Sequence, residues 1–241
     1  MNSIMKLAST LNVIRKSLKE SADPNVFASA KKFFKEDIKI YGVSSTAAQK
    51  IGKETFKLIK DAPKEDIWEL CEALWKSGYN EEASLACTFS DAMAMQFMPD
   101  DFKIFEHWVK DYVSNWASCD TLCNHTVGTF VEMYPTYIPE IQKWAKSKNR
   151  WMRRASAVTF IIPARKGLFL NNLFEIADTL LLDSDDLVQK GYGWMLKAAS
   201  EAHCAEVFEY VMSKKAVMPR TALRYAIEKM PADKKAMAMK K

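Results

Sequence analysis

The segment RWMRRA, residues 150–155, starts a pattern that decides the fold. DLVQKG at 186–191 and AVMPRT at 216–221 share with it a basic residue, a small residue and an apolar face. Each of the three follows a shorter amphipathic segment, at 137–144, 173–181 and 206–212. The pattern predicts three consecutive pairs of helices in the second half of the chain.

The spacing of the pairs is that of a helical repeat. The basic positions Arg154, Lys190 and Arg220 lie 36 and 30 residues apart. One helix pair cannot bury its apolar face alone, so neighbouring pairs stack into a continuous core. We therefore expect an all-α superhelix (solenoid) of HEAT-like helical repeats, forming a single domain over residues 1–241. An irregular helical bundle is the alternative.

Helical periodicity also dominates the first half. Apolar residues recur every three to four positions in 67–75 and 102–113. Ser44 or Ser45 is expected to cap a helix that reaches Ile59. The basic tail, 231–241, is expected to be frayed. Four tryptophans at apolar helical positions are expected in the core, namely Trp68, Trp75, Trp108 and Trp144.

The composition is that of a globular helical protein. Of the 241 residues, 49% are apolar and 27% charged, while 7 Gly and 8 Pro are too few for the turns of an all-β fold. No apolar run approaches the length of a membrane span, and residues 1–19 lack the features of a signal peptide. We expect an intracellular protein with reduced thiols.

The charge is unevenly distributed. From residue 140 onward the chain has 19 Lys and Arg against 11 Asp and Glu, a net charge of +8. Residues 1–139 have 16 against 19, a net charge of −3. This asymmetry favours a nucleic-acid partner for the C-terminal half, although a solvated helical surface would also account for it.

One carboxylate stands out for its aromatic neighbours. Trp116 and Asp120 are four residues apart, so on a helix they share one face. Trp194 occupies a comparable place in a later helical segment. Indole faces attract cations, and a carboxylate stabilises positive charge that develops nearby. The three residues predict a site for an electron-poor group carried by a polyanion.

The chain resembles the AlkD-type DNA alkylation repair proteins, which are HEAT-like-repeat DNA glycosylases. The resemblance rests on NWxxxD at 115–120 with Gly128, on WMRRA at 151–155, on GYGWMLK at 191–197 and on YGV at 41–43. It extends from about residue 28 to residue 230. The chain differs at Lys197, where many relatives have Arg.

The resemblance implies a DNA glycosylase acting on cationic N3- or N7-alkylated purines in duplex DNA, without a base-flipping pocket. It implies that Asp120 is the catalytic carboxylate, that Trp116 and Trp194 are its paired indoles, and that Arg154 meets the DNA near the lesion. The alternative is a non-catalytic HEAT-like scaffold that binds distorted or branched DNA or a protein.

The implied partner is alkylated duplex DNA, bound by a monomer in the cytoplasm, at the nucleoid. Residues that start or line the inner helices are expected to contact phosphates. These expected DNA contacts are Arg153, Arg154, Lys190, Lys197, Arg220 and Arg224.

We expect neither a metal nor a cofactor. Cys119 and Cys123 are four residues apart, but His125 would point away from both on an α-helix. No second pair of Cys or His has zinc spacing. These thiols are expected to be small buried side chains.

Overall fold

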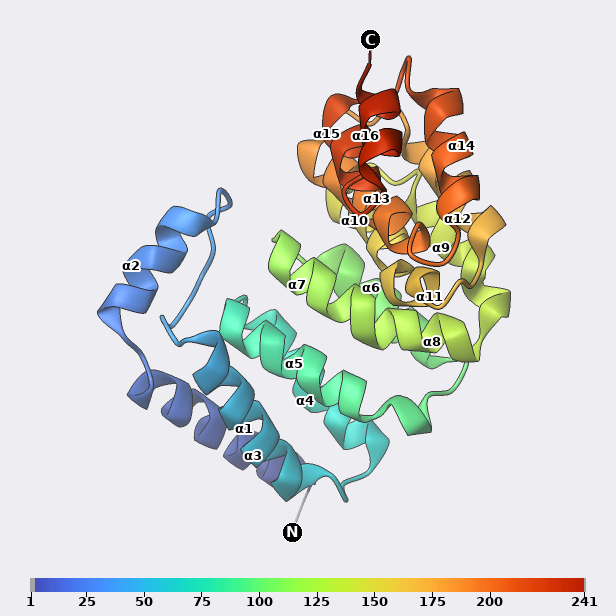
Figure 1. Ribbon diagram of the computed structural model, residues 1–241. Coiled ribbons are helices and arrows are strands. Elements are labelled where there is room, and N and C mark those ends of the chain that lie inside the picture. Colours follow the sequence, from blue (N-terminus) through green and yellow to red (C-terminus); the bar gives the residue numbers. More distant parts are fainter. Residues whose placement is uncertain (1–2, 241) are drawn as a thin grey trace. The chain divides into compact units, whose positions relative to one another are not determined.

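The computed structural model of the protein describes residues 3–240, and helices account for most of that range (Figure 1). The β pairing found in this range is one isolated bridge between Lys39 and Tyr79. The predicted all-α class is therefore confirmed. No helix within residues 3–240 is both long and apolar enough to cross a bilayer.

The helices have the following bounds: α1 Ser3–Glu20, α2 Pro24–Phe33, α3 Ser45–Ile59, α4 Lys64–Lys76, α5 Asn80–Ala92, α6 Asp101–Asp111, α7 Trp116–Thr121, α8 Gly128–Met133, α9 Ile138–Trp144, α10 Arg150–Val158, α11 Ile161–Arg165, α12 Leu170–Leu180, α13 Asp186–Ala199, α14 Cys204–Lys214, α15 Arg220–Ala226 and α16 Ala232–Met239. Three short segments complete the list: the 3-10 turns η1 (Ala94–Gln96) and η3 (Pro135–Tyr137), and the π-helical segment η2 (Leu122–Val127).

The chain divides into two compact units between Thr121 and Leu122. The sequence predicted one domain over residues 1–241. Each unit has its own apolar core, with Trp108 fully buried in the first and Phe160 and Tyr192 fully buried in the second. Burial of such large side chains is the main favourable contribution to folding of each unit.

The first unit is built around α4 and α5. These helices pack against each other, α3 packs on α5, and α1 contacts α3 and α4. The predicted core positions Trp68, Trp75 and Trp108 are all buried here, and Trp144 is buried in the second unit. Ser44 caps α3 as predicted, since its hydroxyl accepts the Ala47 N–H at 3.3 Å.

A buried carboxylate fixes the turn between α2 and α3. Oε1 of Glu81, on α5, accepts the backbone N–H groups of Tyr41, Gly42 and Val43 at 3.1, 2.9 and 3.1 Å. Gly42 has φ +88, and a Cβ there would lie 2.8 Å from Phe27 Cβ. Only glycine adopts this turn without strain. The turn therefore holds the connection between α2 and α3 in one conformation.

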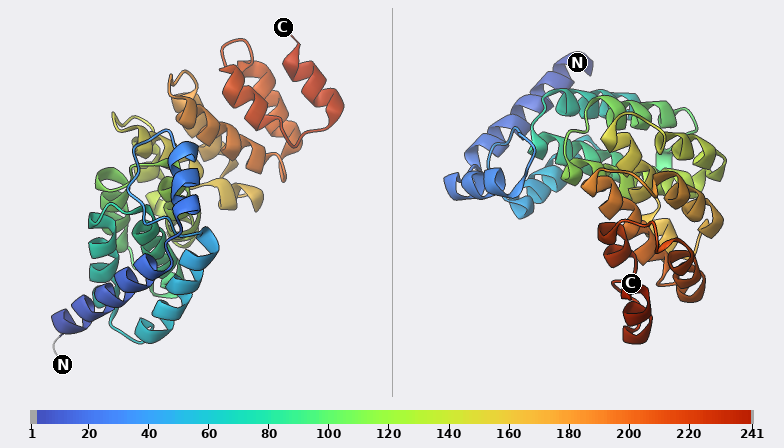
Figure 2. Two further views of the ribbon diagram at one scale, coloured as in Figure 1. Left: turned by 90° about the vertical axis from the view of Figure 1, so that its left-hand side faces the viewer. Right: turned by 90° about the horizontal axis from the view of Figure 1, so that it is seen from above.

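In the second unit the helix pairs predicted from the sequence follow one another (Figures 1 and 2). Helix α10 packs on α13 and α13 packs on α15, whereas α9 and α12 contact each other and lie against α10 and α13 respectively. The segments at 150–155 and 186–191 start α10 and α13. The segment at 216–221 mostly precedes α15, which starts at Arg220.

The expectation of a frayed tail is wrong for residues 232–239. They form α16, which packs on α14 and buries Ala238 completely. The small apolar residues Ala232, Ala236 and Ala238 favour a helix, and the neighbouring helix supplies a surface to cover. Lys241 lies outside the described residues.

Close packing between α13 and α15 depends on Gly193. A Cβ at this position would lie 2.7 Å from Tyr225 Cβ and 2.8 Å from the Ala222 carbonyl oxygen. Since the carbonyl belongs to the helix backbone, relief requires the two helices to move apart. Gly193→Ala is expected to lower the free energy of unfolding by about 1–3 kcal/mol, as measured by urea denaturation.

Gly52→Ala is the matched control for this prediction. Its Cβ would lie 3.6 Å from Leu85 and Thr88, at ordinary contact distance, inside α3. Replacing this helical glycine is expected to be neutral or to stabilise by up to about 1 kcal/mol. Equal destabilisation by the two changes would show that the helix spacing at Gly193 is not the cause.

Glu72 in α4 gathers four donors. Its carboxylate accepts from Tyr112 OH at 2.6 Å and Trp108 Nε1 at 2.7 Å, and lies 3.3 Å from both Lys76 Nζ and His107 Nε2. Partial burial by itself would raise the pKa of the Glu72 carboxyl, but these contacts outweigh it and lower that pKa.

Because its folded-state pKa is lowered, ionised Glu72 stabilises the fold above the unfolded-state pKa. This stabilisation is lost as the pH falls through the folded-state pKa. We expect Glu72→Gln to flatten the loss of unfolding free energy between about pH 5 and pH 3, measured by urea denaturation. Glu69→Gln, at an exposed position of the same helix, is the control and should leave the profile unchanged. Identical profiles for wild type and Glu72→Gln would contradict the assignment.

Candidate functional site

Trp116 and Asp120 both lie on the short helix α7, one turn apart, and both are half-buried. Asn115 sets the start of this helix. Its Oδ1 accepts the Ser118 N–H at 2.9 Å, while its Nδ2 donates to Asn80 Oδ1 at 3.1 Å. The Asn115 side chain thus caps α7 and ties it to the first turn of α5.

Trp116 belongs to an aromatic cluster that the sequence did not reveal. Its ring is stacked on Phe34 with centroids 5.5 Å apart and an interplanar angle of 22°. Phe33 meets it edge-on, with centroids 5.6 Å apart. Both phenylalanines lie at the end of α2, more than eighty residues earlier in the chain. This distance explains why periodicity alone gave no signal for the cluster.

Beyond Asp120 the chain does not continue as a regular α-helix. Residues Leu122–Val127 form the π-helical segment η2. The extra residue per turn changes the faces on which the following side chains lie. At Gly128 a Cβ would lie 2.8 Å from the Thr159 carbonyl oxygen, so glycine allows the backbone after η2 to approach the end of α10.

The two cysteines near Asp120 lie in the apolar core. Cys119 and Cys123 are completely buried, whereas His125 is exposed. Within residues 3–240, no group of three His, Cys, Asp or Glu side chains is arranged to hold a metal ion. The thiols fill core positions, as expected for small apolar side chains.

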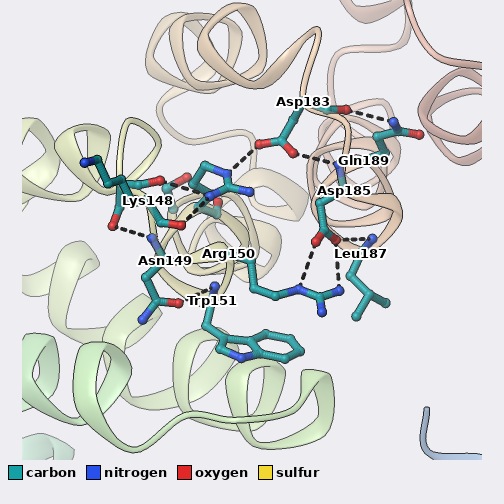
Figure 3. A network of polar contacts seen from close by, with 11 residues as sticks. Lys148, Asn149, Arg150, Trp151, Asp183, Asp185, Leu187 and Gln189 are labelled. Carbon is teal, nitrogen blue, oxygen red and sulfur yellow. Dashed lines mark hydrogen bonds and ion pairs between the residues drawn. The ribbon is translucent and has the colours of Figure 1, made fainter. Parts of the chain in front are cut away.

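Trp194 is half-buried on α13, and a polar network fixes the start of that helix (Figure 3). Asp185 caps α13 by accepting the Leu187 N–H at 2.9 Å. The same carboxylate pairs with Arg150 in α10. Its Oδ1 accepts a hydrogen bond from Nη2 at 3.1 Å, and its Oδ2 lies 2.9 Å from Nε as an ion-pair contact. The pair ties the start of α13 to the first residue of α10.

Arg153 joins the same network from the next turn of α10. Its Nε lies 2.6 Å from Asp183 Oδ2, and its Nη1 donates to the Ser147 carbonyl at 3.0 Å. The two charged side chains are mostly buried, with 20% and 10% of their surface exposed. Arg153, which was predicted to contact DNA, therefore forms an ion pair with Asp183 inside the protein.

Arg154 is buried between α10 and α13. It donates to the Leu187 carbonyl oxygen, and only 5% of the residue is exposed. A Cβ at Gly191 would lie 3.4 Å from Arg154 Cγ, so the absence of a side chain at Gly191 leaves room for the arginine stem. This arginine therefore joins α10 to the first turn of α13.

The remaining predicted cations lie on α13 and α15. Lys190 pairs with Asp186 at 2.6 Å, and Lys197 pairs with Glu228 at 3.0 Å. Lys197 also lies 5.6 Å from the centre of the Tyr225 ring. Arg220 and Arg224, unlike Arg153 and Arg154, are exposed.

The chain matches the family model described as DNA alkylation repair enzyme over residues 14–230. Among solved structures it is similar to a predicted DNA alkylation repair enzyme from Enterococcus faecalis, with a TM-score of 0.78 and 20% sequence identity. That match covers 88% of this chain and 98% of the other, and it shows a shared fold. No curated relative matches the chain. Since the family model spans most of the sequence, the protein belongs to the DNA alkylation repair enzyme family.

Proposed function

We propose that the protein is a DNA glycosylase that hydrolyses the N-glycosidic bond of purines alkylated at N3 or N7 in duplex DNA. The observation that carries this proposal is Asp120 on α7, one turn from the half-buried Trp116, in a chain of the alkylation repair family. Asp120 places a carboxylate beside an aromatic surface suited to a cation.

The chemistry of the substrate explains why one carboxylate suffices. Alkylation at N3 or N7 gives the purine a positive charge, so the base is already a good leaving group and needs no protonation. As the bond from C1′ to nitrogen breaks, its electron pair goes to the purine and neutralises it, while positive charge develops on the sugar. Water adds to C1′ and loses a proton to solvent, leaving an abasic site.

In this mechanism Asp120 stabilises the developing charge on the sugar and orients the attacking water. A fixed negative charge aimed at the transition state contributes more in a site with little water than in bulk solvent. Trp116 and Trp194 supply indole faces, each contributing about 0.5–2 kcal/mol through contact with cationic groups. Each 1.36 kcal/mol, roughly, is a tenfold change in rate.

Backbone contacts hold the duplex in this proposal. Exposed cations on the second unit, Arg220 and Arg224 first among them, bind phosphates without reading sequence. Four further cations contribute less, because carboxylates or carbonyls inside the protein already compensate part of their charge. They are Lys190, Lys197, Arg153 and Arg154. The protein acts as a monomer built from HEAT-like repeats, in the cytoplasm where it meets the nucleoid.

Asp120→Asn is expected to slow base release by about 10²–10³-fold, because the amide keeps the shape but removes the charge that stabilises the transition state. The measurement is release of free base from duplex DNA methylated at N7 of guanine and N3 of adenine. DNA affinity, measured in parallel, should change little.

Asp61→Asn is the control for loss of one negative charge at an exposed position of the same unit, and its rate should equal that of wild type. An unchanged rate for Asp120→Asn would contradict the mechanism. Tight binding without base release by wild type would instead place the protein among non-catalytic DNA-binding scaffolds.

The phosphate contacts predict a specific salt dependence. Replacing Arg224 with Gln should weaken binding to any duplex and reduce the slope of log K against log salt by about one. Lys229→Gln removes the same charge from an exposed position outside the predicted contacts and should leave the slope unchanged. If both variants bind like wild type, Arg224 does not contact the backbone.

A further inference from the structure

Two asparagine side chains join the start of α7 to the start of α5. Asn115 Nδ2 donates to Asn80 Oδ1 at 3.1 Å. Asn80 is the first residue of α5, and Asn115 directly precedes α7. Only 3% of Asn115 is exposed, so water competes little for this hydrogen bond. The two helices pack against each other (Figure 1), and the link determines how their first turns meet.

The cap of α7 determines which way the Asn115 amide points. Its Oδ1 accepts the Ser118 N–H at 2.9 Å. Its backbone carbonyl accepts the Ser118 hydroxyl at 3.1 Å and the Cys119 N–H at 3.2 Å. With Oδ1 engaged in the cap, the amide turns its Nδ2 donor toward Asn80, where it needs an acceptor. One side chain therefore both starts α7 and ties it to another helix.

Helix α5 is a fixed anchor for this link. The Asn80 N–H donates to the Lys39 carbonyl at 2.8 Å. The next residue, Glu81, is buried and its carboxylate accepts the N–H groups of residues 41–43. Since the first two residues of α5 are held in this way, Asn80 resists movement, and the hydrogen bond fixes Asn115 rather than following it.

Helix α7 depends on contacts at its first turn. It has six residues, and at Leu122 the chain passes into the π-helical segment η2. A stretch this short gains little stability from its own hydrogen bonds, and the change of register at η2 separates it from the helix that follows. Trp116 and Asp120 are its first and fifth residues. Their direction is therefore set where α7 begins.

We propose that Asn80 and Asn115 are positioning residues for base release. The inference rests on the proposed function, because it assigns the pair the task of holding the Asp120 carboxylate and the Trp116 ring against the substrate. In this role neither asparagine contacts the reacting atoms. A misplacement of about 1 Å can cost about 10²-fold in rate. Loss of the link should therefore slow the chemical step more than it weakens DNA binding.

Two variants break the link and keep the cap. Asn80→Ala removes the acceptor and leaves Asn115 unchanged. Asn115→Ser keeps an oxygen that can cap α7 but lacks the amide nitrogen. Asn80→Asp is the rescue variant, because its carboxylate still accepts from Asn115. Asn25→Ala removes an exposed amide from the first turn of α2 and is the matched control.

The measurement is single-turnover release of 3-methyladenine from methylated duplex DNA at saturating protein, with DNA affinity and thermal unfolding followed in parallel. We expect Asn80→Ala and Asn115→Ser each to slow release by about tenfold. The double variant should be no slower than either, because all three lack the same hydrogen bond. DNA affinity should change little, and Asn80→Asp and Asn25→Ala should release base at the wild-type rate.

A pair that only stabilises the fold would give a different result. Its loss would lower the unfolding temperature and leave the release rate of the folded protein unchanged. Wild-type rates in Asn80→Ala and Asn115→Ser, or equal slowing by Asn80→Asp, would overturn the proposal and leave the glycosylase function standing.

Hydrogen exchange separates this inference from the glycosylase proposal, because it needs neither DNA nor turnover. In Asn80→Ala the backbone amides of residues 116–121 should exchange faster than in wild type, whereas those of α4 should be unchanged. If wild type releases no base, the glycosylase proposal fails. Faster exchange in 116–121 would then still support the hold on α7 and refute only the task assigned to it. Unchanged exchange there would overturn the inference whether or not the protein releases base.

Discussion

The second unit depends on the ion pairs that join α10 to the loop before α13. Arg150 and Arg153 reach Asp185 and Asp183, and Asp185 at the same time caps α13. Helix α13 packs against α10, α12 and α15, so its start fixes the arrangement of the repeat around it. The mostly buried pair of Arg153 and Asp183 adds little net stability, but loss of one partner would leave the other charge buried and is costly. The network therefore determines where α13 begins and where Trp194 lies.

Much of the fold could be predicted because it follows from short-range pattern. Apolar residues at helical spacing gave the pairs that became α9 and α10, α12 and α13, and α14 and α15. The Ser44 cap was predictable for the same reason, since a cap depends on a few neighbouring residues. The α16 helix was missed because its stability comes from α14, and a sequence of alanine, lysine and methionine is compatible with both a helix and a frayed end.

The candidate site was predictable only in part. The spacing of Trp116 and Asp120 placed both on one helix, but nothing local indicated Phe33 and Phe34, which come from α2. The π-helical segment after Asp120 was also missed. Sequence periodicity assumes 3.6 residues per turn, so it does not detect a π-helical segment. The backbone at Gly128, just after this segment, lies close to the Thr159 carbonyl, which is thirty-one residues later in the chain. Contacts over such separations are set by tertiary packing.

The pairing of cations changes the meaning of the charge asymmetry. The C-terminal half has a net charge of +8 by composition, yet Arg150, Arg153, Lys190 and Lys197 each face an Asp or Glu. The pairs of Arg150, Arg153 and Lys197 join separate elements, whereas Lys190 pairs with Asp186 within α13. At distances larger than the separation of the two charges, the fields of each pair largely cancel. In the proposed function, attraction for DNA then comes from fewer cations than the count implies, mainly exposed ones such as Arg224. In the proposed function these few phosphate contacts read no sequence, so selectivity depends on the charge and lability of the alkylated base itself.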